Sequence, residues 1–202
     1  IAAVARIMQP GVKFDNILIL AGKQGAGKST FAKVLGGEWH NDSLHDFRGK
    51  EACEQIQGYW IVELGELTGF SKAESNEIKQ FVSRQEDVYR EPYGRRTGSF
   101  PRQCIFIGTT NDNHFLRDLT GNRRFWPVDI GITEPTKDIF TQFALERDQI
   151  WAEAVAAYML GESLCLSKAA NSEAVDAQES HSEINPKVGV ISEFLERKIP
   201  SD

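Results

Sequence analysis

The feature that most constrains this chain is a glycine-rich loop between an apolar run and a helical pattern. The apolar run, residues 16–21 (NILILA), follows Pro10 and Gly11, as a buried parallel strand would. Residues 22–29 (GKQGAGKS) then match G-x-x-x-x-G-K-[ST] at every constrained position. Residues 29–35 have a helical pattern that ends at two glycines. This order predicts a phosphate-binding loop; the alternative is an ordinary glycine turn with an exposed lysine.

The loop also predicts the atoms that would hold a nucleotide. Glycines let the backbone wrap around phosphates, so that N–H groups and the N-terminus of the helix face the anion. Lys28 would reach the β- and γ-phosphates, and the Ser29 hydroxyl would hold Mg²⁺. ATP and Mg²⁺ are therefore the expected cofactors. The residues expected to bind the nucleotide are Gly22, Gln24, Gly25, Ala26, Gly27, Lys28, Ser29 and Thr30.

A second apolar run, residues 59–64, carries an acid near its end. Glu63 could hold the metal ion or polarise water, and Glu66 could act as the general base on the attacking water. Leu64 stands where a second acid would complete an acidic pair, so the sequence leaves open which glutamate has which role. Both could also be solvated acids at the end of a strand.

A third apolar run, residues 104–109, leads to Asn111. The amide of Asn111 could contact the γ-phosphate or orient water, although asparagine is also a common turn residue. Apolar strands separated by helical or irregular stretches predict an α/β fold, with a mostly parallel central sheet flanked by helices. Residues 125–130 could add a strand, for which Pro127 favours an edge position.

The pattern changes after the predicted sheet. From residue 138 apolar residues recur at helical spacing, which predicts a helical C-terminal layer. Residues 171–182 are expected to form a surface helix or a linker, and residues 188–199 a last amphipathic segment. We therefore divide the chain into a P-loop ATPase core, residues 1–135, and a C-terminal helical region, residues 136–202, whose end could link to a further domain.

Residues 84–102 form the one basic stretch of an otherwise acidic chain, with two more arginines than acids. Aromatic rings alternate with the arginines, as in a surface that follows a nucleic-acid strand by contacting phosphates and stacking bases. Gly94 and Gly98 would permit the turn of a hairpin. A solvated loop is the alternative. The arginines are Arg84, Arg90, Arg95, Arg96 and Arg102, and the rings are Tyr89, Tyr93 and Phe100.

A pair of arginines, Arg123 and Arg124, follows the third apolar run. Either could be offered to a nucleotide held by a neighbouring copy, where it would stabilise the charge of the transition state. Alternatively, one or both could pair with Asp118 or Asp129 on the surface.

Composition bounds these interpretations. A chain of 202 residues with 41% hydrophobic and 26% charged residues is globular in composition, which excludes disordered, collagen-like and disulfide-scaffold classes. It has no apolar run of about 18 residues, so we expect no membrane span. Three widely separated cysteines and no signal-peptide pattern predict a cytoplasmic protein. The net charge of −6 means that any nucleic-acid partner would need a local basic patch.

The motifs and their order, over roughly residues 16–166, resemble the virulence-associated protein E family. The segments that carry the resemblance are residues 22–29, 60–67, 78–79, 87–90, 92–94, 108–111 and 120–127. That family is similar to the superfamily 3 helicases of the AAA+ class, found as primase-helicases of phages, prophages and mobile islands. The resemblance implies a hexameric ring ATPase, a homo-oligomer that moves along single-stranded DNA during replication.

The resemblance also implies residue roles. Lys28 and Ser29 match the Walker A pair, Glu63 the Walker B acid, Asn111 sensor 1, and Arg123 or Arg124 the arginine finger. Lys79, Asp87 and Arg90 fall on the segment that the superfamily uses for subunit contact and DNA. The residues expected to contact nucleic acid are Lys79, Arg90, Arg95, Arg96 and Arg102. Because the chain begins without a methionine, we expect a missing N-terminal domain that could be primase-like.

The function expected from the sequence is an ATP-hydrolysing motor domain of a replicative helicase or primase-helicase. Two alternatives belong to other classes. A P-loop phosphotransferase would use the same loop on a small acceptor, and a nucleotide-gated interaction module would bind nucleotide without hydrolysing it. ATP turnover measured with and without single-stranded DNA would separate the three.

Overall fold

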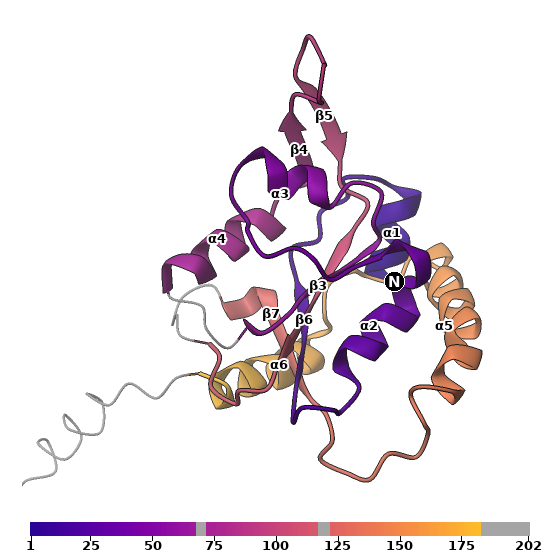
Figure 1. Ribbon diagram of the computed structural model, residues 1–202. Helices are drawn as coiled ribbons and strands as arrows, with labels where there is room; N and C mark the ends of the chain where they lie inside the picture. The colour runs from indigo at the N-terminus through magenta and orange to yellow at the C-terminus, as the bar shows by residue number, and fades with distance from the viewer. Residues whose placement is uncertain (68–71, 117–121, 183–202) are drawn as a thin grey trace, which may run out of the picture.

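The computed structural model describes residues 1–67, 72–116 and 122–182 (Figure 1). Its centre is a five-stranded sheet in the order β2-β3-β6-β1-β7, and every pairing in it is parallel. The strands are β1 (Ile17–Ala21), β2 (His40–Asn41), β3 (Ile61–Leu64), β6 (Ile105–Thr110) and β7 (Phe125–Asp129). The prediction of an α/β fold with a mostly parallel sheet is confirmed.

The central strand β1 is buried on both faces, which explains its uninterrupted apolar sequence. Ile17 and Ile19 point to one face and pack with β3 and β6 residues, while Leu20 packs on the other face with Ile61 and Ile107. The edges of β1 are also covered, because it pairs with β6 on one side and β7 on the other. In this register Ala21 lies opposite Thr110 of β6, so the strands end together.

Helices cover both faces of the sheet (Figure 1). One face packs on α1, α2 and α5 through residues such as Ala3, Ala32 and Trp151, and the other on α3 and α4 through Cys53 and Phe81. The helix α6 packs against β7. The bounds are α1 (Ala2–Met8), α2 (Lys28–Gly36), α3 (Gly49–Gln55), α4 (Lys72–Val82), α5 (Gln142–Met159) and α6 (Lys168–Ser180), with 3₁₀ turns η1 (Gly37–Trp39) and η3 (Asn122–Arg124).

The C-terminal region is helical, as its spacing predicts. Most of the segment assigned to a surface helix or linker lies in α6. Ser167 caps this helix, and its hydroxyl accepts a hydrogen bond from the Ala170 N–H at 3.2 Å. The strand with Pro127 lies at the edge of the sheet, where its missing N–H costs no ladder bond. The amphipathic segment at residues 188–199 lies outside the described residues, and the division at residue 135 stays a prediction. Within the described residues no helix is long and apolar enough to cross a membrane.

The basic stretch forms a hairpin that projects from the body (Figure 1). Its strands, β4 (Glu86–Tyr89) and β5 (Gly98–Pro101), pair antiparallel and separate β3 from β6 in the chain. At its base the Arg102 guanidinium donates two hydrogen bonds of 2.7 Å to the carboxylate of Asp87 and another to the carbonyl of Phe81. Asp87 and Arg102 are only 1% and 2% exposed. The hairpin is therefore anchored in the core by a buried ion pair.

This anchor predicts a large effect of one substitution. Asp87→Ala would leave the Arg102 charge buried without its partner, and should lower the free energy of unfolding by about 3–5 kcal/mol. The matched control is Glu86→Ala on the same strand, whose carboxylate is exposed and bonds to Ser99, and it should cost less than about 1 kcal/mol. Urea unfolding followed by circular dichroism measures both, and equal losses would contradict the assignment.

Candidate nucleotide site

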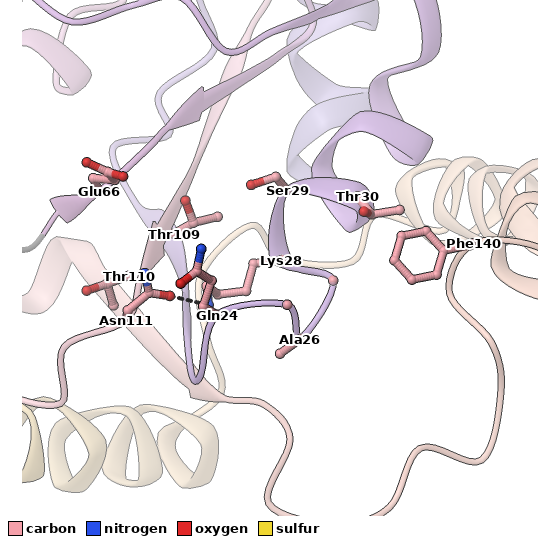
Figure 2. Close-up of a pocket in the computed structure, with 12 residues that line it drawn as sticks. Gln24, Ala26, Lys28, Ser29, Thr30, Glu66, Thr109, Thr110, Asn111 and Phe140 are labelled. Atoms are coloured by element: carbon pink, nitrogen blue, oxygen red, sulfur yellow. Dashed lines mark hydrogen bonds between the residues drawn. The ribbon is translucent and has the colours of Figure 1, made fainter.

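The glycine-rich loop, the end of β6 and the segment after β3 meet around one cavity of about 300 Å³. Because β1, β3 and β6 are parallel, their carboxyl ends lie at the same edge of the sheet, where ligands bind in open α/β folds. Figure 2 shows the side chains around this cavity. The residues that line it are Gln24, Gly25, Ala26, Gly27, Lys28, Ser29, Thr30, Glu66, Thr109, Thr110, Asn111 and Phe140.

The loop leads directly into the N-terminus of α2, as the motif requires. Gly25 and Gly27 both have φ of 82°, a left-handed conformation that residues with a Cβ rarely adopt. The N–H of Gly22 donates to the carbonyl of Thr110 at 3.2 Å, which ties the loop to the end of β6. The free N–H groups at the start of a helix favour a bound anion.

The Lys28 side chain points back over the loop. Its ammonium donates to the carbonyls of Gly22 and Lys23 at 2.6 and 2.8 Å and to Oδ1 of Asn111 at 2.7 Å (Figure 2). Burial lowers the pKa of the Lys28 ammonium from its ordinary value. The structure thus brings together two residues, Lys28 and Asn111, that are 83 positions apart in the sequence.

The two glutamates have different surroundings. Glu63 is buried, and its Oε1 accepts a hydrogen bond from the hydroxyl of Thr109 at 3.1 Å while its Oε2 lies 3.2 Å from Nε2 of His40. Glu66 is exposed, lines the cavity, and has φ of 50°, which is uncommon for a residue with a side chain. The carboxylate in direct reach of the cavity is therefore that of Glu66, with Glu63 behind Thr109.

The donor set is compatible with Mg²⁺ in the presence of phosphates. No group of three or more His, Cys, Asp or Glu side chains that could hold a metal ion occurs among the described residues. Mg²⁺ is commonly held by one or two protein oxygens, with phosphates and waters completing its octahedron. Ser29 and Glu63 are the residues expected to contribute: Ser29 lines the cavity, and Thr109 joins Glu63 to it.

The two arginines before β7 differ in their contacts. The side chain of Arg124 donates to the hydroxyl of Ser83 at 2.9 Å and lies 3.4 Å from Asp15, whereas Arg123 is exposed and its carbonyl accepts from Asn16. Neither lines the phosphate cavity. The alternative partner Asp129 instead lies 3.0 Å from His181, and Asp118 lies outside the described residues.

Five residues were expected to contact nucleic acid, and two of them, Arg102 and Lys79, are buried. Arg102 is buried in its pair with Asp87, and Lys79 is 6% exposed with its ammonium 5.6 Å from the ring centroid of Phe125. The prediction for these two residues is corrected: their side chains pack inside the protein, and a buried cation cannot contact a nucleic-acid strand. Arg90, Arg95 and Arg96 are exposed on the hairpin.

The rings of the hairpin also divide between two environments. Tyr89 and Phe100 stack on each other with centroids 4.5 Å apart, so they stabilise the hairpin itself. Tyr93 at the turn is fully exposed and is the ring open to solvent. Of the three aromatic residues expected to stack on bases, Tyr93 alone has the exposure that this role requires.

Four residues at the site were not predicted from the sequence, among them Thr110, which lines the cavity beside Thr109. His40 and Thr109 contact Glu63, and Phe140 lines the cavity from the segment between β7 and α5. A hydroxyl within the apolar run of β6 was a usable signal for Thr109. His40 and Phe140 carry no such signal, because their contacts depend on how distant segments pack.

Comparisons with known proteins agree with this fold. A shikimate kinase from Tolumonas auensis is 25% identical over 150 residues, which cover 71% of this chain and 85% of the kinase. Two solved apo structures of the NrS-1 C-terminal region share the fold, with TM-scores of 0.53 and 0.52 at 18% and 19% identity. Each match covers 96% of this chain but 46% and 45% of the solved chains, so this chain spans a little less than half their length.

The decisive comparison is with protein families. The model of the virulence-associated protein E-like domain matches residues 1–183, a range that includes every residue that the structure describes. This chain therefore belongs to the virulence-associated protein E-like domain family.

Proposed function

We propose that this chain is the ATP-hydrolysing motor domain of a replicative helicase or primase-helicase of phage or mobile-element type, acting on single-stranded DNA. The observation that carries the proposal is the meeting of Lys28, Asn111 and Glu66 in one cavity at the N-terminus of α2. Cation, amide and carboxylate are the groups needed around a γ-phosphate and an attacking water.

The hydrolytic step follows from these positions. Water attacks the γ-phosphorus, its proton passes to the Glu66 carboxylate, and the bond to the bridging β-phosphate oxygen breaks to give ADP and inorganic phosphate. Lys28 would exchange its contacts with loop carbonyls for phosphate oxygens, and Asn111 would orient the γ-phosphate or the water. Ser29 and Glu63 would hold Mg²⁺, which would supply positive charge to the phosphates when bound.

The arginine pair supports a ring of copies. Strand β7 is parallel to β1, so η3 lies at the end of the sheet opposite the phosphate loop, about 17 Å away along five strand residues. An arginine placed there cannot serve its own nucleotide and could serve that of a neighbour. Arg123 is our candidate because it is exposed, whereas Arg124 is held by Ser83 and Asp15.

The hairpin supports nucleic acid as the partner. Arg90, Arg95, Arg96 and Tyr93 are exposed on an element that projects from the body (Figure 1). In a hexameric ring with this element turned inward, six copies would surround a strand with cations and rings. The net charge of −6 is compatible with such a surface, because the positive groups need to be concentrated only there.

A second candidate is phosphotransfer to a small acceptor, which the match to shikimate kinase favours. A kinase would use Lys28 and Ser29 in the same way but would direct the γ-phosphate to a bound hydroxyl. It would need neither an exposed arginine at the far end of the sheet nor a cationic hairpin. A binding module without hydrolysis is the third candidate, and it requires that Glu66 does not activate water.

The first prediction from the proposed function concerns turnover. We expect ATP hydrolysis whose rate rises when single-stranded DNA is added. Lys28→Ala should reduce this rate at least about 100-fold, because the negative charge on the phosphates would no longer be stabilised by the ammonium group. Phosphate release measured with and without an oligonucleotide checks this. Turnover that needs a small acceptor would favour the kinase, and binding without turnover would favour the module.

The DNA effect is tested with the variants Arg95→Ala and Arg96→Ala, and Arg48→Ala is their control. Arg48 is exposed, lies outside the hairpin in the sequence, and pairs with Glu77 of α4. The hairpin variants should lose DNA stimulation and weaken its salt dependence, since each phosphate contact releases counterions, while Arg48→Ala should behave as the unaltered protein. Equal stimulation in all three would remove the hairpin from the proposed DNA surface.

The second prediction separates the two glutamates. Glu66→Gln should still bind ATP but hydrolyse it about 10²- to 10⁴-fold more slowly, because a general base is lost. Glu63→Gln keeps the shape of the buried side chain and should instead raise the Mg²⁺ concentration needed for half-maximal turnover. Hydrolysis titrated with Mg²⁺ measures both effects, and the reverse pattern would exchange the two roles.

The third prediction concerns action between copies. Arg123→Ala should reduce turnover by about 10³-fold or more, as loss of an arginine finger does. Equimolar mixing with Glu66→Gln subunits should restore activity, because about one quarter of the head-to-tail interfaces then join an intact Glu66 to an intact Arg123. Mixed rings with no more activity than either variant alone would exclude Arg123 as a residue supplied in trans.

A further inference from the structure

A second and larger cavity opens beside the phosphate cavity. It has a volume of about 750 Å³, within the range of small-molecule sites, and it shares Gly25, Ala26, Gly27 and Phe140 with its neighbour. Its inner wall is apolar, formed by Leu18, Leu20, Phe31 and Ile130. We call it the apolar chamber. A polar cavity at a helix N-terminus thus continues directly into an apolar one.

The outer wall of the apolar chamber is the segment between β7 and α5, residues 131–140. This segment contacts the phosphate loop itself: a Cβ added to Gly27 would lie 2.9 Å from Cγ2 of Ile139. The loop and the chamber wall are therefore packed together, and the two cavities share Gly25, Ala26, Gly27 and Phe140 as lining.

Phe140 stands at the junction of the two cavities. It lines both, yet 66% of the residue is exposed, so much of the ring is open to contact. Its backbone is held, because its N–H donates to Oδ1 of Asp138 at 2.8 Å and the Thr141 hydroxyl donates to the other oxygen at 2.9 Å. The other chamber ring, Phe31, is already stacked on Phe143 with centroids 5.1 Å apart.

The position of Phe140 relative to the phosphate site indicates which part of a bound nucleotide it would contact. Figure 2 shows Phe140 next to Thr30, on the far side of Lys28 from Asn111. Asn111 and Glu66 belong to the side where the γ-phosphate would react. The opposite side, with Thr30 and Phe140, is where the remainder of a nucleoside triphosphate would leave the loop.

We infer that the apolar chamber is the nucleobase subsite of this nucleotide site and that Phe140 stacks on the base. The inference rests on the proposed function, in that the loop must bind a nucleoside triphosphate. Such a ligand joins a polyanion to a flat aromatic group, and the two joined cavities offer an anion site and an apolar space with an open ring. Stacking of a base on an aromatic side chain is a general source of nucleotide affinity.

The test compares two ligands that share the phosphates, ATP and inorganic tripolyphosphate, by calorimetry with Mg²⁺. The unaltered protein should bind ATP more tightly than tripolyphosphate. Phe140→Ala should weaken ATP binding about 5- to 50-fold and leave tripolyphosphate within about twofold, and Phe140→Trp should retain ATP affinity. The control is Leu145→Ala, an exposed apolar side chain on α5 that lines neither cavity, and it should change neither affinity.

The outcomes distinguish this inference from the proposed function. Equal affinity of the unaltered protein for both ligands, or equal loss of both in Phe140→Ala, would overturn the nucleobase subsite while leaving the phosphate site standing. Failure of the unaltered protein to bind tripolyphosphate would overturn the phosphate site and the inference with it.

A spectroscopic measurement reports stacking directly. The triphosphate of 2-aminopurine riboside should lose fluorescence when it binds to the unaltered protein, because the base stacks on the ring. At saturating ligand Phe140→Leu should restore most of the emission, since an aliphatic side chain fills the space without stacking. Unchanged quenching in Phe140→Leu would contradict the role of Phe140.

Discussion

Burial of β1 on every side is the constraint on which the site depends. Its two faces are covered by helices and its two edges by β6 and β7, so the strand can shift only if the sheet is broken. The glycine-rich loop begins where β1 ends. Asn111 directly follows the end of β6, the strand that pairs with β1. The hydrogen bond from Lys28 to Asn111 is thus a consequence of strand register and needs no long-range adjustment of the loops.

The parallel direction of the strands also separates the chemistry into two ends. The phosphate loop, Glu66 and Asn111 lie at the carboxyl end of the sheet. The hairpin base and the arginine pair lie at the other end, where Ser83 contacts Arg124. One chain therefore presents the candidate nucleotide cavity at one end and Arg123 with the hairpin at the other, an arrangement that head-to-tail contacts between copies would require.

Features with local sequence signals could be predicted. Features that depend on which side chains are buried could not. The strand, loop and helix around Lys28, and the hairpin with glycines near its turn, could be predicted because their signals lie within a few residues. Arg102 and Lys79 were misassigned, since a charged residue in a basic stretch gives no indication that a core carboxylate or an aromatic ring will enclose it. The same limit explains His40, whose contact with Glu63 requires β2 to pair with β3.

Strand β7 gives these two ends a physical connection. It follows Arg123 and Arg124 at its start, and its last residues lead into the segment that walls the apolar chamber and carries Phe140. Its five residues are paired with β1 along their whole length, and Ile130 continues the pairing through its N–H to the carbonyl of Ala21. In the proposed hexamer, Arg123 would contact the nucleotide of a neighbouring copy, and Phe140 would contact the nucleotide of its own copy. The two residues would thus flank the two ends of one strand. A strand held so closely to β1 cannot bend independently, so the two contacts would be positioned together.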